Sequence, residues 1–330
     1  MELRDLPVIT HYRNLTLDGF QRRAIAHIEA GRSVLVSAPT GTGKTLVADY
    51  VIEKMYRDGR RVVYTAPIKA LSNQKYKEFK ALLGEAHVGI LTGDIVINPE
   101  ATVLIMTTEI FRNLLHVDVE RLADVGYVVF DEIHYIDDPV RGSVWEESLI
   151  FMPPAMRFLG LSATIPNCEE LAAWAEQVHG QEVAVVRHDE RAVPLSHHLF
   201  ERQLGLCNRE QLLKRFKRYA QRFGVTDAGR LKARFEPTTH LDLIEVLKDG
   251  YLPCLYFTFS RRRCEIHASE LGARKGLLAS EARAQIAQVI ERQTKRYNGV
   301  GESRLRAVEP LLMRGIAYHH AGLLPLVKDV

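Results

Sequence analysis

The chain has 330 residues, a net charge of only +3, and 46% hydrophobic and 26% charged residues, which is typical of a globular protein with enough chain for two domains. No apolar run approaches the ~18 residues of a membrane span, and residues 1–18 have no signal-peptide core. The four cysteines are scattered without a CxxC pair, which argues against a zinc site or a disulfide framework, so we expect a cytoplasmic protein without a membrane partner.

Short β-branched runs alternate with helical patterns over the first two hundred residues. Apolar runs of this length, separated by helices, predict a parallel sheet that is covered on both faces. This is a doubly wound α/β fold, in which ligands bind at the carboxyl ends of the strands. The predicted strands are 33–37, 61–65, 88–91, 103–106, 127–130 and 158–161, and the predicted helices are 43–57 and 68–83.

Residues 202–236 interrupt this alternation and predict a basic helical connector. Ten Lys or Arg stand against two acids between Arg202 and Arg234, a local charge of +8 that favours contact with phosphates. A solvated charged face is the alternative explanation. A second α/β pattern follows, with predicted strands at 252–259 and 315–319 and a helix at 261–271. We therefore predict a first domain over 1–200, a connector over 201–240 and the start of a second domain over 241–330.

A phosphate-binding loop, SAPTGTGKT, is predicted at residues 37–45, between a strand and a helix. Two glycines let the backbone turn tightly and direct amides at phosphate oxygens, next to a helix N-terminus. Lys44 is expected to reach the β- and γ-phosphates, and the Thr45 hydroxyl to bind Mg²⁺. Alanine at position 38, where the strict pattern has glycine, favours the helicase variant of this loop. The predicted ATP-binding residues here are Ala38, Pro39, Thr40, Gly41, Thr42, Gly43, Lys44 and Thr45.

Two adjacent carboxylates end the apolar strand of the segment VVFDEIH, residues 128–134. Asp131 is expected to hold Mg²⁺ through water, and Glu132 to polarise the attacking water. A capped strand end is the alternative, but the phosphate loop upstream argues against it. The tripeptide SAT follows another strand, and its hydroxyls, Ser162 and Thr164, could link the nucleotide site to a neighbouring surface. Taken alone, SAT is explained equally by a helix cap before Asn167.

Eight motifs occur in a fixed order along the chain: APTGTGKT (38–45), APIKALSNQK (66–75), LTGD (91–94), TTE (107–109), DEIH (131–134), SAT (162–164), FTFSR (257–261) and HHAGLLP (319–325). In this order the chain resembles superfamily 2 DExH-box helicases from about Leu15 to Pro325. It is most similar to the superkiller-like, exosome-associated RNA helicases, which share its Arg141-Gly and Trp145-Glu-Glu segments. The resemblance implies a RecA-like P-loop NTPase domain, an incomplete second RecA-like domain, and an ATP-dependent RNA helicase that hydrolyses nucleoside triphosphate.

The resemblance also implies roles for individual residues. Gln21 would hydrogen-bond adenine next to Phe20, although Leu15 stands where relatives often have a stacking aromatic residue. His134 would relay the nucleotide state to the second domain, together with the coupling residues of the SAT motif. Short loops with amides and hydroxyls grip a single strand without reading its bases. The implied nucleic-acid-binding residues are Lys69, Ala70, Gly93, Asp94, Thr107, Thr108, Ser260 and Arg261.

The implied cofactors are ATP and Mg²⁺, and the implied partners are single-stranded or tailed duplex RNA and a ribonuclease assembly. The family's arginine-finger motif QxxGRxGR and the GINxPA-like motif before it do not occur up to Val330. We therefore expect ATP binding, with hydrolysis by these residues alone left open. Two alternatives remain: a DNA-repair helicase of the same superfamily, or a nucleic-acid-binding module that holds ATP without turnover. Adjacent His319 and His320 point to opposite faces of a strand and are not expected to share a metal.

Overall fold

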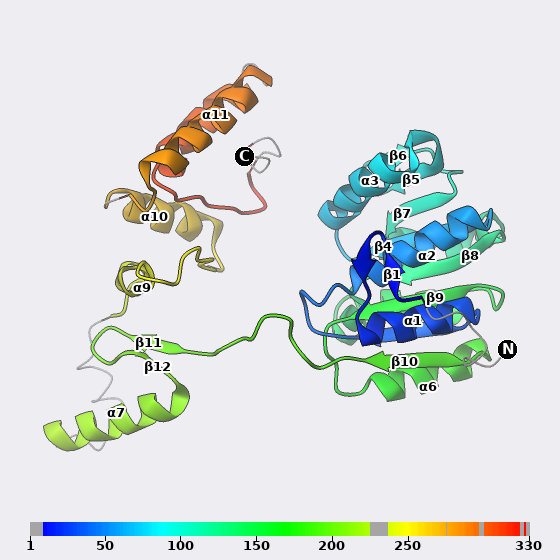
Figure 1. Ribbon diagram of the computed structural model, residues 1–330, viewed down its shortest axis with the longest axis horizontal. Helices are drawn as coiled ribbons and strands as arrows, with labels where there is room; N and C mark the ends of the chain where they lie inside the picture. Colours follow the sequence, from blue (N-terminus) through cyan, green and yellow to red (C-terminus); the bar gives the residue numbers. More distant parts are fainter. Residues whose placement is uncertain (1–8, 225–236, 275, 297–299, 324–326, 328–330) are drawn as a thin grey trace. The chain divides into compact units, whose positions relative to one another are not determined.

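The computed structural model describes residues 9–224, 237–274, 276–296, 300–323 and 327 (Figure 1). The chain divides into two compact units, Met1–Leu195 and Ser196–Val330. The finer division into a first domain, a connector over 201–240 and a second domain stays a prediction.

An eight-stranded sheet forms the centre of the first unit, in the order β10-β3-β9-β8-β4-β7-β5-β6. Neighbouring strands are parallel except β5 and β6, which pair antiparallel. Every residue of β3, β5, β7 and β8 is buried, as expected where helices cover both faces. The strands are β3 (Ser33–Ser37), β4 (Arg61–Ala66), β5 (Val88–Leu91), β6 (Val96–Ile97), β7 (Val103–Thr107), β8 (Val125–Phe130), β9 (Arg157–Ser162) and β10 (Val183–Arg187).

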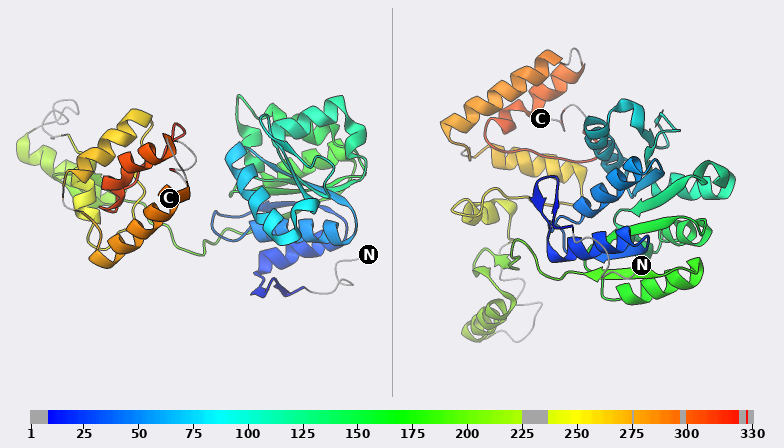
Figure 2. Two further views of the ribbon diagram at one scale, coloured as in Figure 1. Left: turned by 90° about the horizontal axis from the view of Figure 1, so that it is seen from above. Right: turned by 45° about the vertical axis from the view of Figure 1, so that its right-hand side comes forward.

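Helices cover both faces of this sheet (Figure 2). Their side chains and those of the sheet form two hydrophobic cores. One core joins the sheet to α1 (Gly19–Glu29), α2 (Thr45–Arg57) and α3 (Lys69–Leu83). The other core joins it to α4 (Thr108–Val117), α5 (Ser143–Phe151) and α6 (Cys168–His179). Short 3₁₀ turns lie at Glu85–His87, Val119–Leu122 and Ile133–Asp137.

A small hairpin of β1 (His11–Tyr12) and β2 (Leu15–Thr16) precedes α1. Its turn residue Arg13 pairs with Asp49 at 3.0 Å and also with Glu53, so two acids of α2 hold the hairpin. The predicted doubly wound α/β fold is confirmed in this unit. All six predicted strands are present with ends shifted by two residues or fewer, and the two predicted helices begin at Thr45 and Lys69.

The second unit begins with a hairpin of β11 (Leu199–Glu201) and β12 (Gly205–Cys207). The predicted basic helix is present as α7 (Arg209–Phe223), with Leu212, Phe216 and Tyr219 half-buried along one side. The predicted connector residues 225–236 lie outside the described residues. The remaining described helices are α9 (His240–Leu247), α10 (Arg261–Gly272), which confirms the helix predicted at 261–271, α11 (Ser280–Arg296) and α12 (Val300–Leu312).

The strands predicted at 252–259 and 315–319 are wrong, because the structure assigns no strand to either segment. A parallel strand needs a neighbour to satisfy its amides and carbonyls. Among the described residues of this unit, β11 and β12 pair only with each other. The apolar side chains of the first segment are therefore left in solvent, with Leu255 85% and Phe257 87% exposed.

Over the described parts of the chain, no helix is both long enough and apolar enough to span a bilayer. All four cysteines are free thiols, with Cys168 and Cys207 buried.

Candidate nucleotide and nucleic-acid site

The motifs of the first unit follow the carboxyl ends of adjacent parallel strands. From β3, which leads into the phosphate loop, the sheet order runs through β9, β8, β4, β7 and β5. The carboxyl ends of parallel strands share one edge of a sheet, which is where ligands bind in doubly wound folds. The fold thus collects segments from 38 to 164 along one edge: the loop, then SAT, DEIH, APIK, TTE and LTGD.

The loop between β3 and α2 turns on Gly41 and Gly43, whose φ angles are +85° and +79°. Side chains other than glycine rarely adopt these angles. Lys44 Nζ donates to the Ala38 carbonyl at 2.6 Å, and the Thr42 hydroxyl donates to the Pro39 carbonyl at 2.7 Å. Burial lowers the pKa of Lys44, and the carboxylates of the DEIH motif oppose this shift. The ammonium therefore lies inside the loop, near those carboxylates.

Asp131 is held in place from three sides. The Tyr64 hydroxyl donates to Oδ2 at 2.5 Å, the Glu132 amide donates to Oδ1 at 3.0 Å, and the Asp131 amide donates to the Thr65 carbonyl at 3.0 Å. Tyr64 is fully buried, and burial, followed by the Asp131 charge, raises its pKa well above the ordinary value. Tyr64 therefore stays protonated and can donate its hydrogen bond to Asp131. The Asp131 carboxylate and the Thr45 hydroxyl at the start of α2 offer the oxygen ligands that Mg²⁺ prefers.

Glu132 follows at a sharp change of backbone direction. Its φ of +52° lies in the left-handed region, and its Oε2 lies 3.4 Å from His134 Nδ1. Both side chains are partly exposed. The carboxylate is therefore reachable by water while it lies within ion-pairing distance of His134.

We expect Tyr64→Phe to weaken divalent-cation binding in the presence of an ATP analogue by about 10–100-fold. The ring stays, but the buried carboxylate loses a donor, and a hydrogen bond to a charged group contributes about 1.5–3 kcal/mol. Mn²⁺ electron paramagnetic resonance measures this affinity without turnover. Tyr127→Phe is the matched control, because Tyr127 is also buried and donates to the Arg32 carbonyl from the other end of β8. An equal loss in both variants would exclude a specific role for Tyr64.

The SAT segment contacts the phosphate loop through its main chain. The Ala38 amide donates to the Ser162 carbonyl at 3.2 Å, and the Ile165 amide donates to the Ser37 hydroxyl at 3.3 Å. Ser162 is fully buried, whereas Thr164 is exposed. The two predicted coupling residues thus lie next to the loop, one facing inward and one outward.

Gln21 lies against the phosphate loop and is almost fully buried. Its Oε1 accepts from the Asp18 amide at 2.8 Å, and its Nε2 donates to the Gly43 carbonyl at 3.1 Å. The first contact belongs to a capping box of α1, and the D-x-x-Q spacing could have revealed it in the sequence. The hydrogen bond from Gln21 to the Gly43 carbonyl has no local sequence signal. Phe20, in contrast, lies in the core and stacks on His188, and Leu15 is 53% exposed.

The predicted nucleic-acid residues of the first unit differ in exposure. Lys69 and Asp94 form an ion pair, with their side chains 52% and 72% exposed, so they can exchange this contact for a ligand. Thr107 is buried, and Thr108 has no exposed surface, so Thr108 is the least able to touch a strand. Ala70 and Gly93 lie next to the ion pair in sequence. Ser260 and Arg261 belong to the second unit, where the Ser260 hydroxyl caps α10 by accepting from the Arg263 amide at 3.3 Å.

Arg141 joins several motifs at the same edge, which sequence reasoning did not anticipate. Its guanidinium donates to the Pro67 carbonyl at 2.7 Å and to Glu109 at 2.5 Å. It also lies over the rings of Tyr135 and Trp145, 5.9 and 5.6 Å from their centroids. One side chain therefore fixes the relative positions of the APIK, TTE and DEIH segments.

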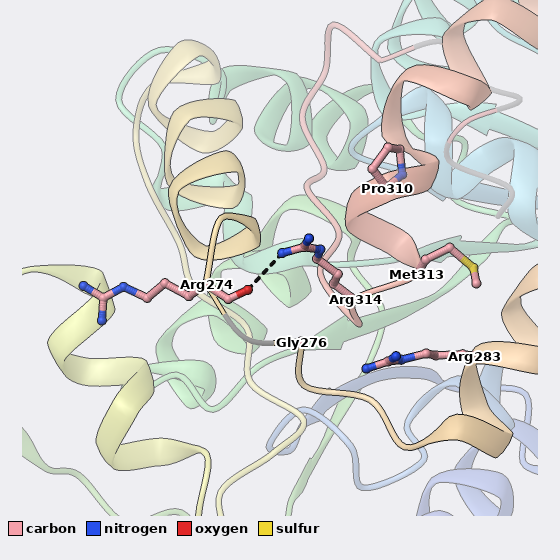
Figure 3. Close-up of a pocket in the computed structure, with 6 residues that line it drawn as sticks. All are labelled: Arg274, Gly276, Arg283, Pro310, Met313 and Arg314. Atoms are coloured by element: carbon pink, nitrogen blue, oxygen red, sulfur yellow. Dashed lines mark hydrogen bonds between the residues drawn. The ribbon is translucent and has the colours of Figure 1, made fainter.

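A hollow of about 540 Å³ lies in the second unit, lined by Arg274, Gly276, Arg283, Pro310, Met313 and Arg314 (Figure 3). The Arg314 guanidinium is already satisfied by the carbonyls of Gly272 and Arg274. Figure 3 shows the Arg274 side chain pointing away from Arg283. Because the three guanidinium groups do not converge, we assign no anion to this hollow.

The sequence was compared with known families and curated proteins. Residues 18–171 match the family model described as DEAD/DEAH box helicase. The chain is 39% identical to "ATP-dependent RNA helicase mtr4" of Schizosaccharomyces pombe, over 96% of this chain and 30% of that protein. It is 37% identical to "Superkiller complex protein 2" of Homo sapiens (95% and 27%) and to "Probable helicase HelY" of Mycobacterium tuberculosis (99% and 39%). The chain thus spans about a third of the length of these relatives.

Proposed function

Because the chain carries a DEAD/DEAH box helicase domain and is related to the Mtr4 and superkiller helicases, we propose that it is the ATP-binding part of an RNA-dependent motor. The observation that supports this most directly is the common sheet edge. The phosphate loop and DEIH lie on strands separated only by β9, and the predicted strand-gripping loops follow on β4, β7 and β5. Nucleotide and nucleic acid would therefore bind side by side.

The nucleotide would be held by the loop amides around Gly41 and Gly43 and by Lys44. To reach the phosphates, Lys44 exchanges its contact with the Ala38 carbonyl for a phosphate oxygen. A bound Mg²⁺, held by Thr45 and Asp131, would supply charge neutralisation on the phosphates. Glu132 would accept a proton from the attacking water, and its exposed position leaves room for that water.

The nucleic acid would contact the exposed pair of Lys69 and Asp94 and the neighbouring loop ends. Relatives named RNA helicases favour RNA as the strand, and a ribonuclease assembly is proposed as a partner from the resemblance alone. Contacts to the backbone rather than to bases would make binding independent of sequence and dependent on salt.

Where this chain turns over ATP, we expect single-stranded RNA to stimulate the turnover and DNA of the same sequence to stimulate it less, because 2′-hydroxyl contacts distinguish RNA from DNA. Turnover is measured with each strand in parallel with binding of a fluorescent ATP analogue. Lys44→Ala should abolish both the turnover and the binding.

The alternatives correspond to different outcomes of this experiment. Equal or stronger stimulation by DNA would favour a DNA-repair helicase. Analogue binding that depends on Lys44 but leads to no turnover would favour a non-hydrolysing module. No analogue binding at all would refute the nucleotide site.

A further inference from the structure

Three side chains that could ligate a metal converge between α9 and α10. These are His240, the first residue of α9, and His267 and Glu270 on α10. One potential ligand atom from each lies within 4.8 Å of the other two. None of the three belongs to a motif that the proposed function uses.

Local structure fixes the positions of these side chains. The Thr239 hydroxyl accepts from the Asp242 amide at 3.3 Å and so caps α9 directly before His240. His267 and Glu270 are three residues apart on α10 and therefore share one face of that helix. His240 is only 8% exposed, and α9 packs against α10. The cluster is thus anchored by two helices instead of a loop.

The separations approach those of a zinc site. Glu270 Oε2 lies 3.3 Å from His267 Nδ1 and 3.5 Å from His240 Nε2. Ligands at about 2.0–2.2 Å from a tetrahedral Zn²⁺ stand roughly 3.3–3.6 Å apart. Two of the three separations already fit, and the two imidazole rings lie with centroids 4.2 Å apart. The third pair of ligand atoms, on the two histidines, lies within 4.8 Å.

The chemistry of the three side chains also suits a metal. Two imidazole nitrogens and one carboxylate oxygen are ligands that Zn²⁺ accepts. Glu270 adds a negative charge beside His240, and the positive charge of Arg274 acts on His240 in the opposite direction. The Tyr256 ring lies 5.9 Å from both imidazoles and limits access from that direction.

We propose that His240, His267 and Glu270 bind one Zn²⁺, with water as the fourth ligand, and that the metal fastens the start of α9 to α10. The competing arrangement has no metal. In it, His240 Nε2 donates to the His267 carbonyl at 3.2 Å, and His267 Nδ1 pairs with Glu270. The metal would replace these two long hydrogen bonds by coordination bonds.

The experiment titrates the metal-free, reduced 330-residue chain with Zn²⁺ by calorimetry and with Co²⁺ by absorption spectroscopy. His267→Gln and Glu270→Gln are the test variants, because both side chains are more exposed than His240 and their loss leaves the core intact. His319→Gln is the matched control, since His319 is an exposed histidine of the same unit outside the cluster.

We expect one Zn²⁺ per chain, at least tenfold weaker binding in both test variants, and no change in the control. Zn²⁺ should also raise the unfolding temperature of the parent chain but not of the test variants.

Absence of stoichiometric binding would overturn the proposal in favour of the hydrogen-bonded arrangement. Equal binding in all variants, or a Co²⁺ spectrum with thiolate charge transfer, would overturn it in favour of another site, such as Cys254 or Cys264. ATP turnover plays no part in these outcomes, so the inference stands or falls independently of the proposed function.

Discussion

Glu132→Gln lowers RNA-stimulated ATP cleavage by about 10²–10⁴-fold and leaves ATP-analogue binding unchanged. The amide cannot accept a proton from the attacking water, and general-base catalysis contributes about this factor. The hydrogen bonds of Tyr64 and of the residue 132 amide to Asp131 do not involve the Glu132 side chain, so the proposed Mg²⁺ ligand stays in place.

Single-turnover cleavage of radiolabelled ATP measures the chemical step, and analogue fluorescence measures binding. The matched control is Asp137→Asn, which removes an exposed carboxylate from the same 3₁₀ turn. Cleavage within a few-fold of the parent in Glu132→Gln would remove Glu132 from the role of base. A parallel loss of binding would instead indicate a structural role.

Trp145→Ala lowers the free energy of unfolding of the first unit by about 3–5 kcal/mol, the usual range for a fully buried tryptophan. Trp145 has no exposed surface and stacks on Tyr135, with ring centroids 5.7 Å apart. The truncation also removes a ring under Arg141. The side chain that ties the APIK and TTE segments together is thereby loosened.

Urea unfolding followed by circular dichroism measures this loss, provided that the dependence on urea is the same in both proteins. Trp145→Phe is the control. In the part of the chain that the structure describes, Trp145 Nε1 has no hydrogen-bond partner. The substitution by phenylalanine therefore removes side-chain volume but no hydrogen bond. We expect a clearly smaller loss with phenylalanine. Similar losses in both variants, or a loss below about 1 kcal/mol for alanine, would contradict this view of the core.

The first unit was largely predictable because its signals are local. Apolar runs such as 33–37 and 103–106 are buried on both faces in the structure, so their composition alone identified them. Strand order then brought the motifs together, because parallel strands end at one edge. The same reasoning failed at 252–259, where an equally apolar run has no partner strand among the described residues. An apolar run predicts a strand only if another segment is present to pair with it.

The supporting contacts of the site were not predictable, because each joins residues far apart in the sequence. Tyr64 and Asp131 are separated by 67 positions, and Arg141 and Pro67 by 74. Nothing in a run of valines and tyrosines shows which hydroxyl will face a carboxylate of another strand. The sequence therefore identified the groups proposed to do chemistry, whereas the groups that orient them required the structure.

The hydrogen bond from Gln21 to the Gly43 carbonyl connects base recognition with the conformation of the phosphate loop. If Gln21 turns its amide toward a base, this hydrogen bond to the loop around the phosphates changes as well. A nucleotide that engages Gln21 poorly would then be positioned poorly for cleavage, even at saturating concentration. Discrimination among ATP, GTP and CTP would accordingly appear in kcat as well as in Kd.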